Sequence, residues 1–107
     1  MGKKESVVEN YLCTNVGIAG GITRKVVYQG RKGSPDRWCL FPDGRLLLVE
    51  TKAAGEEPEA LQIHEMETLR KLGFYVAWAD TQAGIARILA AFHSGMEAAV
   101  FNVEFPL

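Results

Sequence analysis

Three polar residues stand where two apolar strands are expected to begin and end. Glu50 and Lys52 follow the apolar run 46–49. Because residues two apart in a strand share a face, their side chains should point the same way. Asp36 lies at the start of the preceding strand, and the turn Pro42-Asp43-Gly44 folds that strand back on the next. Antiparallel pairing around this turn should gather two carboxylates and one ammonium group at one end of a sheet.

This combination of residue types suits the hydrolysis of a phosphodiester. Two neighbouring carboxylates repel each other, and a divalent cation removes that conflict because Mg²⁺ prefers one or two carboxylates together with waters and phosphate oxygens. A lysine on the same face can orient the attacking water or neutralise the charge that develops on phosphorus. The alternative is a solvated Glu-x-Lys pair next to an ordinary turn. The joint placement of the residues around one hairpin favours the functional interpretation.

The elements that must position these residues follow from hydrophobic periodicity. Four segments are predicted as strands: 22–29, 37–41, 45–52 and 74–79. Apolar residues at helical spacing predict three helices: one from the N-terminal region to before Gly17, one over 58–72 and one over 81–93. The tail 98–105 is interpreted as a last strand or a docking segment. This order predicts an α/β fold, with a mixed four-stranded sheet flanked by helices, in a single domain 1–107 whose residues 81–107 form a C-terminal helix and tail extension.

Composition excludes several classes of protein. The chain has 107 residues, of which 48% are hydrophobic, and a formal net charge of −1, which suits one globular domain rather than a disordered chain. Its apolar runs are too short to cross a bilayer, and acidic residues stand where a signal peptide needs an apolar core. We therefore expect a soluble, cytoplasmic protein. The two cysteines and two histidines lack the spacing of a zinc site.

The near-neutral total hides an uneven distribution of charge. Residues 1–52 hold nine of the twelve Lys and Arg residues and five of the thirteen acids. A basic half beside an acidic half is typical of nucleic-acid binding, although chance clustering is the alternative. Phosphates require N–H donors, and glycines allow the backbone to approach them closely. The candidate DNA-binding residues are Lys25, Arg31, Lys32, Gly33 and Arg37, with Arg24 beside them.

Several motifs together resemble a known family. They are Gly30-Arg31-x-Gly33-x-Pro35-Asp36-Arg37, Gly44-Arg45, Val49-Glu50-x-Lys52 and Leu61-Gln62. This combination is similar to the VRR-NUC family, a compact branch of the PD-(D/E)xK nucleases, over roughly residues 5–80. The resemblance implies a restriction-endonuclease-like αβββαβ core and a Mg²⁺- or Mn²⁺-dependent nuclease that often acts on structured DNA. Such proteins occur in phages and among repair enzymes, and small stand-alone members are similar to homodimeric Holliday junction resolvases.

The resemblance also implies a role for each matching residue. Asp36 and Glu50 would bind the metal, with the carbonyl of Thr51 as a third oxygen ligand, and Lys52 would be the catalytic lysine. Gln62 occupies the helix position at which the family has a glutamine near the active site. Glu5 matches the acidic residue of the family's first helix, and Glu9, one turn later, could substitute for it.

Two other functions remain open at this stage. One is a DNA-binding accessory module that has the fold without catalytic turnover, and the other is an interaction domain with no role on nucleic acid. The apolar tail residues Val100, Phe101, Val103 and Phe105 are either a dimer surface or part of the core. Tyr28 and Trp38 lie near the basic loop and either stack on bases or pack inside.

Overall fold

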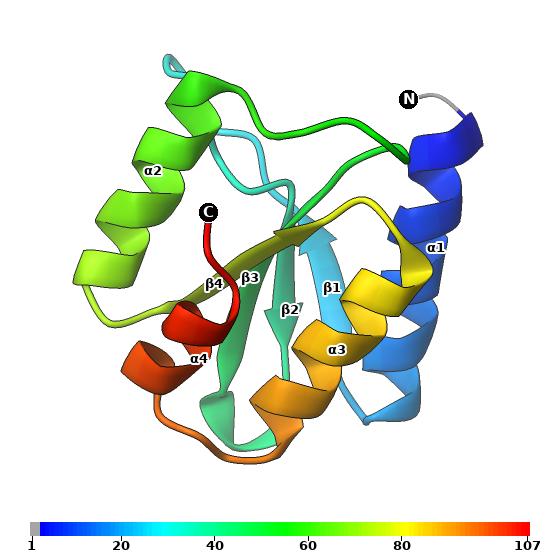
Figure 1. The fold of residues 1–107 in the computed structure, drawn as a ribbon. Helices are drawn as coiled ribbons and strands as arrows, with labels where there is room; N and C mark the ends of the chain where they lie inside the picture. The colour runs from blue at the N-terminus through cyan, green and yellow to red at the C-terminus, as the bar shows by residue number, and fades with distance from the viewer. Residues whose placement is uncertain (1–2) are drawn as a thin grey trace.

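A mixed four-stranded sheet in the order β1-β2-β3-β4 forms the centre of the molecule (Figure 1). The computed structural model describes residues 3–107, with side chains from residue 6 onward. β2 pairs antiparallel with both β1 and β3, whereas β3 and β4 are parallel. The elements are α1 (Lys3–Ile18), β1 (Ile22–Lys25), β2 (Arg37–Leu40), the 3-10 turn η1 (Pro42–Gly44), β3 (Leu46–Thr51), α2 (Ala60–Lys71), β4 (Tyr75–Ala79), α3 (Gln82–His93) and α4 (Ala98–Glu104). The predicted α/β class and αβββαβ order are confirmed.

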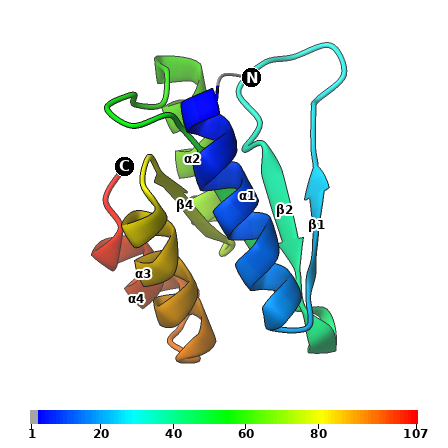
Figure 2. The same ribbon diagram turned by 90° about the vertical axis from the view of Figure 1, so that its right-hand side faces the viewer.

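Helices cover both faces of this sheet, as Figures 1 and 2 show. α1 and α3 pack together on one face, where Leu47 and Val49 of β3 join the larger apolar cluster. α2 covers the other face, where Leu48 packs with Met66 in the smaller cluster. β3 is therefore buried on both sides, which explains its continuous apolar run. Because successive side chains alternate between faces, Glu50 lies on the same side as Leu48, under α2.

The tail 98–105 forms the short helix α4, so the prediction of a last strand is wrong. Its valines and phenylalanines have high strand propensity, but Phe101 and Phe105 are spaced as helical neighbours and their rings lie 4.8 Å apart. Phe101 is fully buried in the larger cluster. The Arg70 guanidinium donates to the carbonyls of Asn102 and Phe105 and thereby binds the C-terminal end of α4. Tertiary packing has overridden local propensity here.

The boundaries of three other elements differ by a few residues from the predictions. α1 continues to Ile18, past the predicted end before Gly17. β1 ends at Lys25 rather than residue 29, because the chain then leaves β2 and crosses toward the N-terminal end of α2 (Figure 1). α2 begins at Ala60 rather than at Pro58, because Glu59 is its N-cap. Within residues 3–107, no helix is both long and apolar enough to span a bilayer.

Candidate active site

The hairpin of β2 and β3 places Asp36 directly beside Glu50. Arg37 pairs with Val49, so the residue before β2 meets the end of β3. The Asp36 amide donates to Oε1 of Glu50 at 3.1 Å. The Thr51 amide and hydroxyl in turn donate to the two carboxylate oxygens of Asp36 at 3.0 and 2.7 Å. The predicted meeting of the two carboxylates is therefore present, and backbone groups fix both of them.

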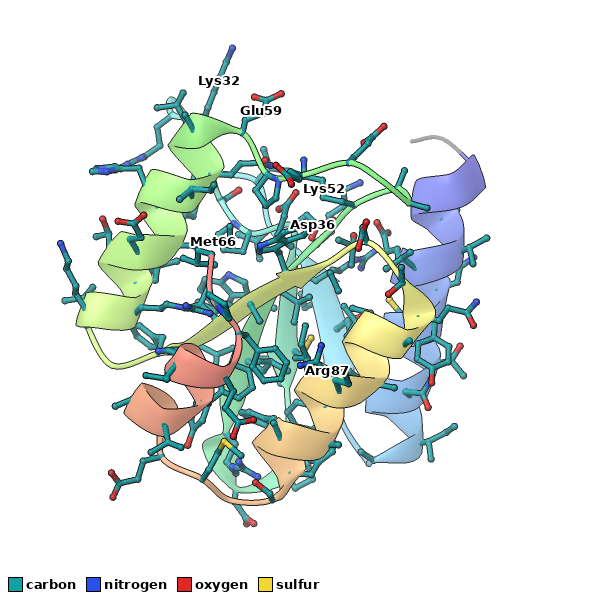
Figure 3. The ribbon with its side chains drawn as sticks, viewed as in Figure 1. Lys32, Asp36, Lys52, Glu59, Met66 and Arg87 are labelled. Carbon is teal, nitrogen blue, oxygen red and sulfur yellow. The ribbon has the colours of Figure 1, made fainter. Side chains whose placement is uncertain are left out.

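Lys52 and Gln62 complete this cluster around Glu50. The Lys52 ammonium lies 3.3 Å from Oε2 of Glu50, and the Gln62 amide donates to the same oxygen at 2.9 Å. The Gln62 side chain also accepts from the Glu59 amide and so caps α2. The N-terminus of α2 is thus tied to the end of β3. Figure 3 shows Lys52 and Asp36 close together above the carboxyl end of β3.

Both carboxyl groups have perturbed acidity. Burial raises the pKa of Glu50 to about 7; the Asp36 charge adds to this rise and the Lys52 ammonium opposes it. Burial also raises the pKa of Asp36, against the two donors of Thr51. The carboxylates of the buried Glu50 and the half-buried Asp36 disfavour each other's ionised form, so both need a nearby opposing charge; the Lys52 ammonium supplies one at Glu50. A divalent cation would supply that charge, so the residues present fit Mg²⁺ or Mn²⁺.

The number of acidic side chains limits the kind of metal site. Among the side chains from residue 6 onward, no group of three His, Cys, Asp or Glu residues could hold an ion. Mg²⁺ commonly binds through one or two carboxylates and keeps several waters or phosphate oxygens. Asp36 and Glu50 suffice for such a site. The Glu5 side chain lies outside the described residues, so its predicted role stays a prediction.

Glu9 and Arg37 form a buried ion pair beside this cluster. Glu9 lies on α1 and is almost fully buried, and one of its oxygens accepts from the Arg37 guanidinium. The other oxygen, Oε2, has no hydrogen-bond partner among the described residues. The Glu9 charge also contributes to the raised pKa of Asp36, after the larger effect of burial. Glu9 is therefore the described acid of α1 nearest the candidate site, and the Arg37 side chain, 17% exposed, faces α1 rather than solvent.

The remaining predicted DNA-binding residues lie at the end of β1 and on the loop that follows it. Lys25, Arg31 and Lys32 are exposed, and Figure 3 shows Lys32 pointing away from the molecule. Gly33 fixes their loop against α2: its φ is +102°, and a Cβ there would lie 2.8 Å from the carbonyl oxygen of Leu61. Only glycine allows this close approach. The basic loop is therefore attached to the same helix end that binds Glu50.

Comparison with known proteins agrees with this geometry. No known family model matches the chain. A solved structure described as "VRR_NUC domain" is similar with a TM-score of 0.78 and 30% identity, over 83% of this chain and 97% of that chain. The chain is also 40% identical over 79 residues to "Putative nuclease p44" of Acyrthosiphon pisum secondary endosymbiont phage 1, which covers 74% of this chain and 85% of that protein. The chain belongs to the VRR-NUC family of nucleases. The resemblance inferred from the loop, hairpin and Glu-x-Lys motifs is thereby confirmed.

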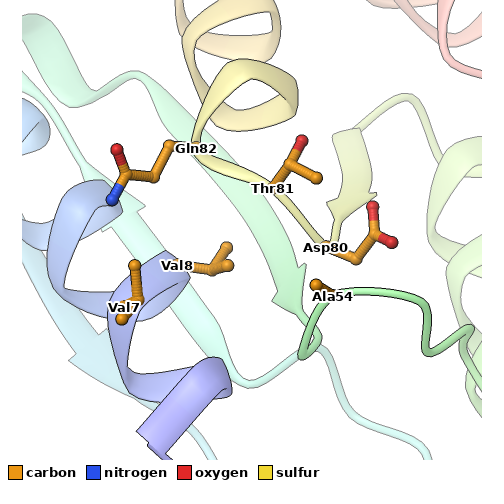
Figure 4. A pocket seen from close by; sticks show the side chains of 6 residues that line it. All are labelled: Val7, Val8, Ala54, Asp80, Thr81 and Gln82. Carbon is orange, nitrogen blue, oxygen red and sulfur yellow. The ribbon is translucent and has the colours of Figure 1, made fainter.

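A pocket lies beside the VRR-NUC site, on the side of α1 and α3 (Figure 4). It has a volume of about 310 Å³ and is lined by Val7, Val8, Ala54, Asp80, Thr81 and Gln82. None of these residues is basic, and the Asp80 carboxylate, which accepts from the Gly55 amide, would repel phosphate. The phosphate-binding surface of this VRR-NUC domain is therefore expected on the other side, along the basic loop.

Sequence reasoning missed three contacts around the VRR-NUC site. The Glu9–Arg37 pair joins residues 28 positions apart, and no local sequence pattern predicts it. Tyr28 and Arg31 both bind the buried carboxylate of Glu65, across 37 and 34 positions. Of the two aromatic residues near the loop, Tyr28 is engaged by Glu65. Trp38 packs against the smaller apolar cluster, which favours packing over base stacking for both.

Proposed function

We propose that this VRR-NUC chain is a Mg²⁺- or Mn²⁺-dependent DNA endonuclease that hydrolyses phosphodiester bonds. The observation that carries the proposal is the pair of neighbouring acids, the half-buried Asp36 and the buried Glu50, joined through the Asp36 amide, with Lys52 on Glu50. Family membership supports the same conclusion, because the phage relative is named a nuclease. An accessory module without turnover would have no need of this complete set of charged groups.

Each residue of the cluster has a distinct role in this proposal. Asp36 and Glu50 would hold the cation, together with the Thr51 carbonyl. The cation, when bound, polarises the phosphoryl group and lowers the pKa of a bound water. The Lys52 ammonium, held 3.3 Å from Glu50, would orient the attacking water or stabilise the charge developing on phosphate oxygens. Gln62 keeps Glu50 in place through its amide.

The charge distribution supports binding to the DNA backbone without base recognition. Lys25, Arg31 and Lys32 are exposed and would donate to phosphates. The Arg37 side chain is 17% exposed and its guanidinium is paired with Glu9, so its predicted contact with DNA would need that pair to open. Binding through phosphates alone should weaken steeply with added salt.

The proposed substrate is branched DNA, cut by a homodimer in the manner of a Holliday junction resolvase. Two matched cuts in a four-way junction require two sites at a fixed spacing, which a two-fold dimer provides. Val100 and Val103 on α4 are exposed, Val103 to 81%, and they support the tail as the dimer surface. The neighbouring Phe74 carbonyl accepts from Asn102 of α4, and the Phe74 side chain is also exposed. Phe101, also predicted for this surface, is buried in the core.

The test is a cleavage assay on a panel of labelled DNA substrates with Mg²⁺, Mn²⁺ or EDTA. Paired symmetric nicks in a four-way junction, lost with EDTA, are expected. Cleavage restricted to flaps or plain duplex would retain the endonuclease and reject the resolvase. Binding of DNA without cleavage under every metal would reject the enzyme and favour the accessory module.

A further inference from the structure

Glu65, a buried acid on α2, binds two residues of the basic loop, Tyr28 and Arg31. The side chain of Glu65 is only 10% exposed, and its two oxygens have different partners. Oε2 accepts from the Tyr28 hydroxyl at 2.7 Å, and Oε1 accepts from one guanidinium nitrogen of Arg31 at 3.1 Å. We propose that Glu65 is a positioning residue for DNA binding, which orients the Arg31 guanidinium to receive a DNA phosphate. This inference rests on the proposed DNA endonuclease function.

The geometry leaves Arg31 available for a second partner. Its side chain is 63% exposed although it is paired with a buried carboxylate. Glu65 engages one guanidinium nitrogen, whereas a guanidinium carries five N–H donors in a fixed fork. The guanidinium carbon also lies 5.8 Å from the centroid of the Tyr28 ring. A carboxylate on one edge and an aromatic ring on one face fix the plane of the group before DNA arrives.

The same helix relates this contact to the catalytic cluster. Glu65 and Gln62 are three residues apart and lie on one side of α2. Gln62 binds Glu50, and Gly33 of the basic loop packs against the Leu61 carbonyl. One rigid helix therefore sets the position of Arg31 relative to Asp36 and Glu50. A phosphate bound at Arg31 would lie at a defined distance from the scissile one.

Two physical effects of Glu65 on DNA binding have opposite signs. As a negative charge near a phosphate chain, Glu65 should weaken binding, so its removal should tighten binding. As a positioning group, Glu65 already orders the long Arg31 side chain in the free protein, so less conformational entropy is lost when DNA binds. Removal of Glu65 should therefore weaken binding. If positioning dominates, Glu65→Gln weakens binding by about 2- to 10-fold although the protein becomes more positive.

The experiment measures the Kd of a labelled four-way junction with EDTA present, for the full chain and matched variants. Glu65→Gln should bind more weakly, whereas Glu67→Gln, which removes an exposed acid of the same helix, should bind equally well or more tightly. In an Arg31→Ala background, Glu65→Gln should no longer weaken binding. With Mg²⁺, KM should rise in the Glu65→Gln variant while kcat is unchanged.

Tyr28→Phe provides a second variant, because it keeps the ring and removes one donor to Glu65. It should weaken binding in the same direction, and thermal unfolding checks that each variant is folded. Tighter binding by Glu65→Gln, or equal weakening with and without Arg31, would overturn the positioning role while wild-type cleavage stands. Failure of the wild-type chain to bind any DNA would instead overturn the proposed function and this inference with it.

Discussion

The acidity of Glu50 predicts how the stability of the metal-free protein depends on pH. Its pKa is about 7 in the folded chain, against an ordinary value of 4.5. Between these values the folded state retains a proton that the unfolded chain has lost, so stability present at low pH is lost as pH rises. The difference corresponds to about 3 kcal/mol of unfolding free energy. The raised pKa of Asp36 acts in the same direction.

Urea unfolding in EDTA at pH 5 and pH 8 measures this effect. From pH 5 to pH 8 the unfolding free energy of the wild type should fall by most of about 3 kcal/mol more than that of Glu50→Gln, because glutamine is neutral at both pH values. Mg²⁺ should then raise the stability of the wild type more at pH 8 than at pH 5, since it binds the ionised carboxylates. Equal changes with pH in the two proteins, or a gain in wild-type stability relative to the variant, would refute the raised pKa assigned to the buried Glu50 carboxyl beside Asp36.

Three further substitutions test other parts of the structure. Glu9→Ala leaves Arg37 buried without its partner, and urea unfolding should show a loss of about 3–5 kcal/mol. Gly33→Ala should displace the basic loop and weaken DNA binding, whereas Gly30→Ala, also at positive φ but in open space, should cost only the local strain of about 1–2 kcal/mol. Val103→Asp places a charge on the exposed face of α4, and light scattering should then report a monomer in place of the proposed dimer.

Each of these expectations has an outcome that contradicts it. A Glu9→Ala protein as stable as wild type would mean that the buried pair adds nothing over an apolar contact. Equal DNA binding by the two glycine variants would show that contact with α2 does not position the loop. Val27 is exposed to 79% on the loop after β1, so Val27→Asp controls for added charge. Dimer loss in both valine variants, or in neither, would reject the α4 surface.

The hairpin that carries Asp36 and Glu50 could be predicted from the sequence because its contacts are local. The turn at Pro42–Gly44 sets the register of β2 and β3, and the two-residue period of a strand determines which side chains share a face. Gln62 could be located near Glu50 only through the family resemblance, because the approach of α2 depends on how the helix crosses the sheet. The sequence did not predict that the Gln62 side chain also accepts from the Glu59 amide and caps α2.

The features that sequence reasoning missed depend on distant packing. α4 is a helix because Phe101 is buried against Tyr75 in the larger apolar cluster and because Arg70 binds the carbonyls of Asn102 and Phe105. Its composition alone is typical of a strand. The inward orientation of Arg37 likewise follows from a glutamate on α1, which no neighbouring residue indicates. Charge patterns therefore indicated a basic loop, whose role in DNA binding stays a prediction, but they did not separate an exposed arginine from one paired with a buried acid.

The central claim is that Glu50 and its cluster catalyse metal-dependent cleavage of DNA. The most direct test compares wild type, Glu50→Gln and Glu57→Gln, an exposed acid in the loop that follows β3, on labelled four-way junction and duplex DNA. In Mg²⁺ or Mn²⁺ the wild type and Glu57→Gln should cut at similar rates, and EDTA should abolish both activities. Glu50→Gln should bind the same DNA and cut at least about 100-fold more slowly. Undiminished cleavage by Glu50→Gln, or wild-type cleavage that persists in EDTA, would contradict the account.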